Sequence, residues 1–102
     1  MLACLLPVAL PLTAAAQPVS PERALELQRL VHQDCGSCHG MTLEGGLGPD
    51  LRPEALAGST PETLALIILE GVPTRAMPGW GPLLSAAEAD WIARYLLEGR
   101  LP

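Results

Sequence analysis

The stretch QDCGSCHGM, residues 33–41, decides how the rest of this chain is interpreted. Cys35 and Cys38 stand three positions apart, and His39 follows the second cysteine directly. Two thiols and an imidazole on so short a segment indicate a site that binds a metal or a prosthetic group. The rest of the sequence has to supply the surroundings of that site.

The pattern Cys-x-x-Cys-His is the attachment sequence of c-type haem. Each thiol can add to one of two vinyl groups on neighbouring edges of the porphyrin, and His39 is then directed to the iron, for which imidazole is a common ligand. Three alternatives compete with this interpretation. A redox-active dithiol favours a thioredoxin-like setting with strands, a zinc site needs four ligands of which only His32 lies near, and a structural disulfide gives His39 no role.

Length and charge restrict the classes of protein further. With 102 residues the chain has room for one domain. It carries 11 acidic and 6 basic side chains, all of the latter Arg, and has a formal net charge of −5. A protein that binds nucleic acid needs a basic surface to neutralise phosphates, so nucleic-acid binding is not expected.

The first sixteen residues, MLACLLPVALPLTAAA, have the character of an export signal. They contain no charged side chain, and Ala14 and Ala16 stand at the spacing that a signal peptidase recognises before Gln17. We predict a cleaved signal peptide over residues 1–16, a cytochrome domain over 17–102 and a periplasmic location. Two prolines make the apolar run a poor membrane span, but a retained N-terminal anchor remains the alternative because no basic residue precedes the run.

Residues 17–102 predict an all-α fold with three main helices and long loops. In no segment do apolar and polar residues alternate over enough positions to predict a strand. The first helix covers residues 20–33 with Ser20 as N-cap, the second opens at Thr60, and the third opens with the capping box Ser85-x-x-Glu88. Their expected apolar faces consist of Ala24, Leu27, Val31, Leu64, Ile67, Ile68, Trp91, Ile92, Tyr95 and Leu96. Long loops of this kind usually surround a bound group or a functional site, and one covalently bound haem would fill that role.

The iron of such a haem needs a sixth ligand or an open site. Met77 lies 38 residues after His39, in a loop stiffened by Pro78, and His/Met is the usual ligand pair of electron-carrying c-type haems. Met41 follows His39 too closely to reach the opposite face of the ring, so we expect it to pack. His32 is expected to be a surface histidine, and a His/His state is the alternative.

At this point the sequence resembles a small class I cytochrome c, in the order of an N-terminal helix, Cys-x-x-Cys-His, GPDL, a Met-Pro loop and an aromatic C-terminal helix. The resemblance implies that the carbonyl of Pro49 accepts the second N–H of His39 and that Leu51 packs on the haem. It also implies that Val31 and Tyr95 meet where the first and last helices cross. The expected apolar surroundings of the iron, which raise its reduction potential, are Leu51, Leu64, Ile67, Ile68 and Trp80.

A narrower resemblance is to the NirC-type, or c55x-like, cytochromes of denitrifying bacteria. It is carried by DCGSCHGMTLEGGLGP, ILEGVPTRAMPGW and LSAAEADWIARYL. The resemblance implies a mono-haem electron carrier that is not an enzyme and that donates electrons to cytochrome cd1 nitrite reductase. The alternatives are a redox or accessory role in d1-haem biosynthesis and, with an open sixth position, a haem-based gas sensor or enzyme. The c-type cytochrome biogenesis machinery would attach the haem, and docking is expected through apolar contacts around Cys35, Gly36 and the Met77 loop.

Overall fold

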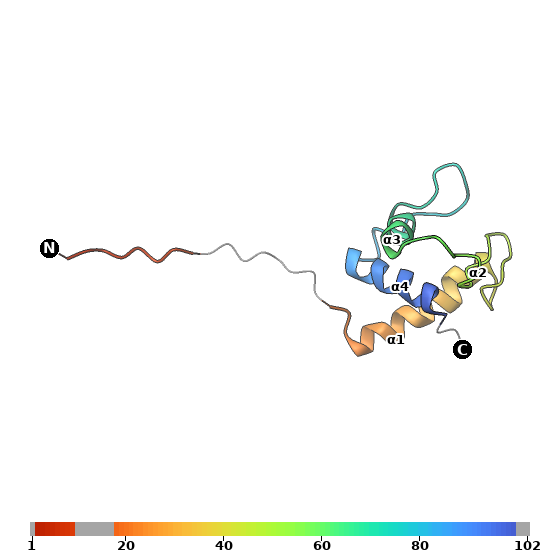
Figure 1. Cartoon of the computed structure of the whole chain (residues 1–102), viewed down its shortest axis with the longest axis horizontal. Coiled ribbons are helices and arrows are strands. Elements are labelled where there is room, and N and C mark those ends of the chain that lie inside the picture. Colours follow the sequence, from red (N-terminus) through yellow and green to blue (C-terminus); the bar gives the residue numbers. More distant parts are fainter. Residues whose placement is uncertain (1, 10–17, 100–102) are drawn as a thin grey trace.

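A computed structural model describes residues 2–9 and 18–99 of the chain. The helical elements in this part are α1 (Pro21–Leu30), η1 (Val31–Cys35), α2 (Gly36–His39), α3 (Pro61–Glu70) and α4 (Ala86–Glu98), and it contains no strand (Figure 1). Residues 2–9 are exposed and carry no secondary structure, whereas the expected signal-peptide cleavage site after Ala16 lies outside the described residues. None of the described helices is long and apolar enough to cross a membrane.

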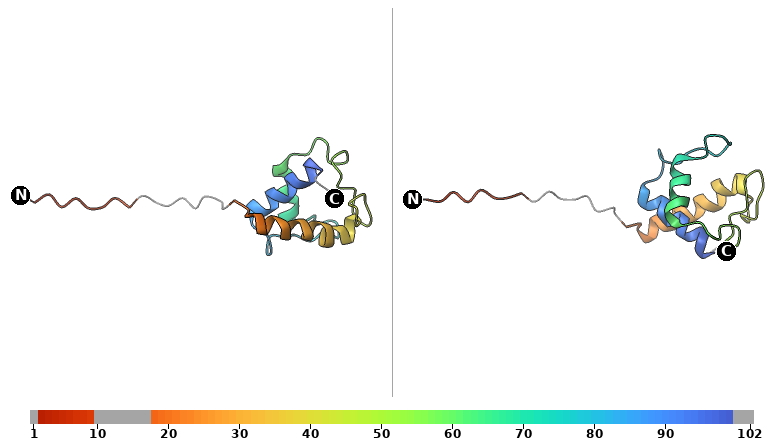
Figure 2. Two further views of the ribbon diagram at one scale, coloured as in Figure 1. Left: turned by 90° about the horizontal axis from the view of Figure 1, so that it is seen from below. Right: turned by 45° about the horizontal axis from the view of Figure 1, so that its top comes forward.

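The first three elements form one continuous helical rod from Pro21 to His39 (Figure 2). The rod begins as expected, because the hydroxyl of Ser20 accepts the backbone N–H of Arg23. It does not end near residue 33. The chain widens into a π-helical turn over Val31–Cys35, in which the N–H of Gly36 reaches the carbonyl of Val31, and then continues as α-helix through the Cys-x-x-Cys-His motif. Such π turns are common at functional sites because they shift the register of a helix locally.

The rod crosses α4, and this crossing holds most of the core (Figures 1 and 2). Val31 and Tyr95 are both buried in it, as the resemblance implied. The cluster also takes in residues from the loops, and its members are Leu27, Val31, Leu43, Leu56, Leu84, Ile92, Tyr95 and Leu96. Burying several large apolar side chains at one crossing, each worth about 1.5–3 kcal/mol, holds the first and last helices together.

Helices α3 and α4 pack through small residues rather than through the expected stripe. Ala65 of α3 meets Ala89 and Ala93 of α4 in a separate buried cluster. Ile67, which we expected to be buried, is 38% exposed. Since each residue advances about 100° around a helix, position 67 lies on the opposite side from position 65, and the alanine contact turns Ile67 outward.

The beginning of α4 is fixed by its capping box and by a link to α1. The Ser85 hydroxyl accepts the N–H of Glu88, and the Glu88 carboxylate accepts the N–H of Ser85. The same carboxylate accepts a hydrogen bond from the guanidinium of Arg23. One side chain therefore caps a helix and joins it to another.

Candidate functional site

The three residues of the motif lie within a little more than one helical turn at the end of the rod. Cys38 is exposed, Cys35 is half-buried and His39 is buried. Both cysteines are free thiols. Burial raises the pKa of the Cys35 thiol to about 11, and the charge of Asp34 acts in the same direction. Before any reaction the Cys35 sulfur is thus protonated at neutral pH.

The imidazole of His39 is oriented by one hydrogen bond. Its Nδ1 lies 2.7 Å from the carbonyl oxygen of Pro49. Because a carbonyl can only accept, Nδ1 carries the proton, and Nε2 keeps its lone pair for a metal. This contact is the one that the resemblance implied, although the Pro49 ring itself is exposed.

The loop after His39 is folded back onto the motif. The N–H of Gly48 donates to the carbonyl of Cys38 at 2.7 Å, and the N–H of Gly45 donates to that of His39 at 2.8 Å. Gly48 also lies against the imidazole: a Cβ at this position would be 2.8 Å from Cε1 and Nδ1 of His39. We did not predict a role for Gly48, although its place directly before Pro49 was a signal.

Met77 is held at the far end of α3. Its carbonyl accepts the N–H of Val72 at 3.1 Å, and further along the loop Trp80 donates its N–H to the carbonyl of Ile68 at 2.9 Å. Met77 is half-buried. The half-buried side chains of Trp80 and Leu51 pack against the main core cluster. Met77 thus lies in the loop between α3 and α4, whereas His39 ends α2, and the pairing of the two as iron ligands stays a prediction.

Met41 differs from its expected place. We expected it to pack, but its side chain is 69% exposed. The reason is the turn at Gly40, where φ is +91° and the chain leaves the helix axis. The Met41 sulfur rests over buried Gly36, 3.6 Å from where a Cβ would stand. Gly36 itself therefore cannot be part of an exposed docking contact, contrary to our expectation.

His32 is not a free surface histidine. Its Nε2 forms a hydrogen bond of 2.9 Å with the hydroxyl of Tyr95 on α4. Trp91 stacks on Tyr95, with ring centroids 5.1 Å apart and planes 12° apart. The contact spans 63 residues of sequence, so a local pattern could not indicate it.

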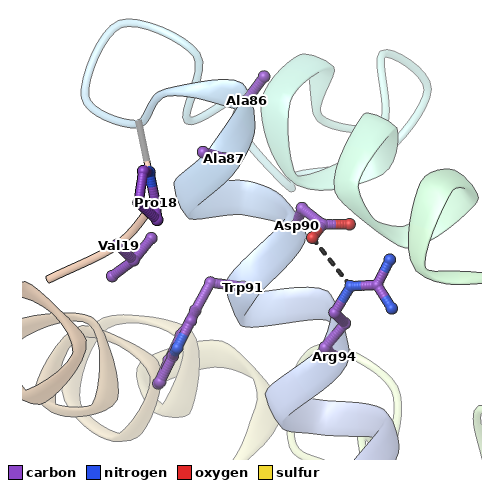
Figure 3. A pocket seen from close by; sticks show the side chains of 7 residues that line it. All are labelled: Pro18, Val19, Ala86, Ala87, Asp90, Trp91 and Arg94. Atoms are coloured by element: carbon purple, nitrogen blue, oxygen red, sulfur yellow. Dashed lines mark hydrogen bonds and ion pairs between the residues drawn. The ribbon is translucent and has the colours of Figure 1, made fainter. Parts of the chain in front are cut away.

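A surface hollow lies beside α4. It has a volume of about 460 Å³, and Pro18 and Val19 line it together with α4 residues that include Trp91 (Figure 3). At its rim Asp90 accepts a hydrogen bond of 2.9 Å from Nε of Arg94. None of the residues expected to bind a cofactor lines this hollow.

The donor set at the end of the rod fits a covalently attached haem. It offers two thiols for thioether bonds and a ring nitrogen whose tautomer is fixed for metal binding. Gly48 of the following loop lies against the His39 ring, where a Cβ would stand 2.8 Å from Cε1 and Nδ1.

Comparison with known proteins agrees with this chemistry. Residues 22–96 match the family described as "Cytochrome C oxidase, cbb3-type, subunit III". The chain is 54% identical over 86 residues to "Cytochrome c55X" of Paracoccus denitrificans (strain Pd 1222), which covers 84% of each protein.

Two solved structures resemble the fold. The "c-type cytochrome NirC" has a TM-score of 0.79 and 49% identity, over 81% of this chain and 99% of that one. The "Dihydro-heme d1 dehydrogenase NirN in complex with DHE" has a TM-score of 0.65 and 37% identity, over 74% of this chain but only 16% of that longer protein. These findings confirm the all-α cytochrome fold and the NirC-like resemblance. The chain belongs to the c-type cytochromes, within the family described as cbb3-type cytochrome c oxidase subunit III, and as such it is an electron carrier with covalently bound haem c.

Proposed function

We propose that the protein is a periplasmic electron carrier, not an enzyme, that delivers single electrons to cytochrome cd1 nitrite reductase. The observation that carries the proposal is the fixed His39 ring, which offers Nε2 while the Pro49 carbonyl holds Nδ1. Similarity to NirC and to cytochrome c55X of a denitrifying species supports the choice of partner.

In this proposal Cys35 and Cys38 hold the haem, and His39 and Met77 bind the iron from its two sides. The bound haem supplies a one-electron couple between ferric and ferrous iron. The thioether of Met77 and the apolar side chains of Leu51 and Trp80 disfavour added positive charge, which raises the reduction potential. Two protein ligands also leave no position for a substrate, so the residues support electron transfer rather than catalysis at the iron.

Two exposed apolar side chains that follow the motif in sequence suit a short-lived contact with a redox partner. Leu47 is 96% exposed and Met41 is 69% exposed, on a loop that is pinned by hydrogen bonds to the motif. The carboxylates of Asp34 and Glu44 are exposed nearby in sequence. An exposed apolar pair among acidic residues favours a partner surface that is apolar with a neutral or basic rim.

Rapid mixing of the reduced protein with oxidised nitrite reductase tests this function. The wild type should transfer electrons at a rate limited by weak docking, and Leu47→Ser or Met41→Ser should each slow transfer about fivefold to tenfold. Leu66→Ser serves as the matched control, because Leu66 is 53% exposed but lies on α3, outside the loops at the motif and at Met77. A rate that falls steeply with added salt toward an acidic partner would contradict the proposed docking.

A second candidate function is a role in making d1 haem. The observation that favours it is the similarity to the cytochrome part of the dihydro-heme d1 dehydrogenase NirN. A deletion strain separates the two functions. If its nitrite reductase contains complete d1 haem but turns over slowly in cells, electron donation is supported and the maturation role fails. If d1 haem is incomplete, maturation is the better account.

A further inference from the structure

The end of α3 and the loop that carries Met77 approach each other more closely than side chains allow. Gly71, the residue after α3, has a φ of +72°. A Cβ on Gly71 would lie 2.6 Å from the nitrogen of Gly79, 2.6 Å from the carbonyl carbon of Pro78 and 2.7 Å from the carbonyl oxygen of Met77. These are backbone atoms, which cannot swing aside as a flexible side chain can.

The approach is mutual, because the second glycine faces the helix end. A Cβ on Gly79 would lie 2.7 Å from the carbonyl oxygen of Leu69 and 2.9 Å from the carbonyl carbon and oxygen of Glu70. Gly79 has no positive φ, so its constraint is contact alone. Because neither glycine has a side chain, the backbone around Gly71 and the backbone around Gly79 can lie in direct contact.

Hydrogen bonds hold the Met77 loop against the end of α3. The N–H of Val72 donates to Met77 at 3.1 Å, and the N–H groups of Trp80 and Gly81 donate to the carbonyls of Ile68 and Leu69 at 2.9 and 3.0 Å. The last carbonyls of a helix have no partner inside it, so the loop supplies the partners here. The loop is thus bonded at Met77 itself and again at Trp80 and Gly81, so a displacement of this backbone carries the methionine with it.

We propose that Gly71 and Gly79 are positioning residues for Met77, and that their close contact sets how far the Met77 sulfur reaches toward the iron. The inference rests on the proposed ligation by His39 and Met77. A methyl group at either glycine must push the loop off the end of α3, which carries Met77 with it. The sulfur–iron bond should weaken, because the displaced loop would have to be strained to bring the Met77 sulfur back to the iron.

Gly58 provides a matched control. It has a φ of +90°, so alanine there suffers the same kind of backbone strain, but nothing lies within 4 Å of its would-be Cβ. Gly58→Ala should therefore lower stability without touching the Met77 loop. Gly79→Ala complements it, because it adds contact at an ordinary φ.

The experiment compares wild type, Gly71→Ala, Gly79→Ala and Gly58→Ala as haem-loaded proteins from periplasmic expression. The readouts are the ferric charge-transfer band that reports a sulfur–iron bond, the reduction potential and the thermal midpoint. We expect the ratio of sulfur-ligated to unligated ferric protein to fall about tenfold or more in the first two variants, with a lower potential. Gly58→Ala should show the wild-type band and potential at a lower thermal midpoint.

Two results would overturn the inference, and they are distinguishable. If the wild type has the band and both loop variants keep it with an unchanged potential, the glycines are merely structural and the proposed ligation stands. If the wild type itself lacks the band, the proposed ligation by Met77 fails and the inference falls with it. Should Gly71→Ala not accumulate, Gly79→Ala decides, with Gly81→Ala as the mildest variant, since its Cβ would be 3.1 Å from the Leu69 carbonyl oxygen.

Discussion

His39 is oriented by two backbone features that lie next to each other in sequence. The Pro49 carbonyl accepts a hydrogen bond from Nδ1–H, and Gly48 lies against the imidazole. A hydrogen bond to Nδ1 makes the ring a stronger donor through Nε2, which favours ferric iron. If His39 binds the iron as proposed, Pro49 and Gly48 would tune the reduction potential without touching the iron.

Gly48→Ala tests this tuning. Its methyl group would stand 2.8 Å from the His39 ring, so the ring must shift and the bond to Pro49 must weaken. We expect a higher reduction potential and a loss of about 1–3 kcal/mol in the free energy of unfolding, as overpacking typically costs. Protein-film voltammetry and denaturant titration measure the two. A loss of stability with no change in potential would contradict the tuning.

The Tyr95 hydroxyl gives a second prediction for a single group. It is the hydrogen-bond partner of His32, while the ring stacks on Trp91. Tyr95→Phe keeps the ring and removes the hydroxyl, so we expect a loss of about 0.5–1.5 kcal/mol in the free energy of unfolding. The absorption spectrum should not change, because His32 bonds to Tyr95 of α4 and Met77 is the proposed sixth ligand. A spectral change would instead support the alternative in which His32 binds the iron together with His39.

At the level of the elements, the link between α1 and α4 depends on the charge of Glu88. Hydrogen bonds from the Ser85 N–H and the Arg23 guanidinium hold the Glu88 pKa below its ordinary value of 4.5. A carboxyl group whose pKa is lowered by folding stabilises the protein fully above its unfolded pKa. That contribution is lost as the pH falls through the folded value.

Glu88→Gln tests the link and its sign. Glutamine still accepts the Ser85 N–H but carries no charge for Arg23. We expect the variant to be less stable at pH 7 by about 1 kcal/mol or less, as is typical of a partly exposed ion pair, with the gap closing as the pH falls below about 4.5. Urea titrations between pH 3 and pH 7 measure it, with Glu54→Gln, an exposed loop residue, as control. A gap that stays constant with pH would argue against an electrostatic link.

Helix starts were predictable from sequence, whereas the length of the first helix was not. Ser20, Thr60 and Ser85 cap as expected because capping depends on residues three positions apart. Continuation through the Cys-x-x-Cys-His motif was missed, because a π-helical turn breaks the 3.6-residue period. The exposure of Ile67 depends on alanines of another helix, which no local pattern reports.

In the whole molecule, the end of the helical rod and two loops carry the residues of the proposed site. The loop after His39 is tied to the motif, and the loop with Met77 is tied to the end of α3. The sequence indicates by residue type and order which side chains would carry the chemistry; of these predictions the structure confirms the contact between His39 and Pro49, and the iron ligands stay a prediction. The sequence could not predict the glycine contacts, since these arise only when distant backbones meet.

In the proposed function His39 and Met77 both bind the iron, so that the protein carries electrons and binds no substrate there. The most direct measurement is the absorption spectrum of the reduced protein before and after exposure to carbon monoxide. We expect low-spin bands that carbon monoxide leaves unchanged. Bands that shift on exposure would show an open or displaceable sixth position, and they would contradict the claim in favour of a gas-binding haem.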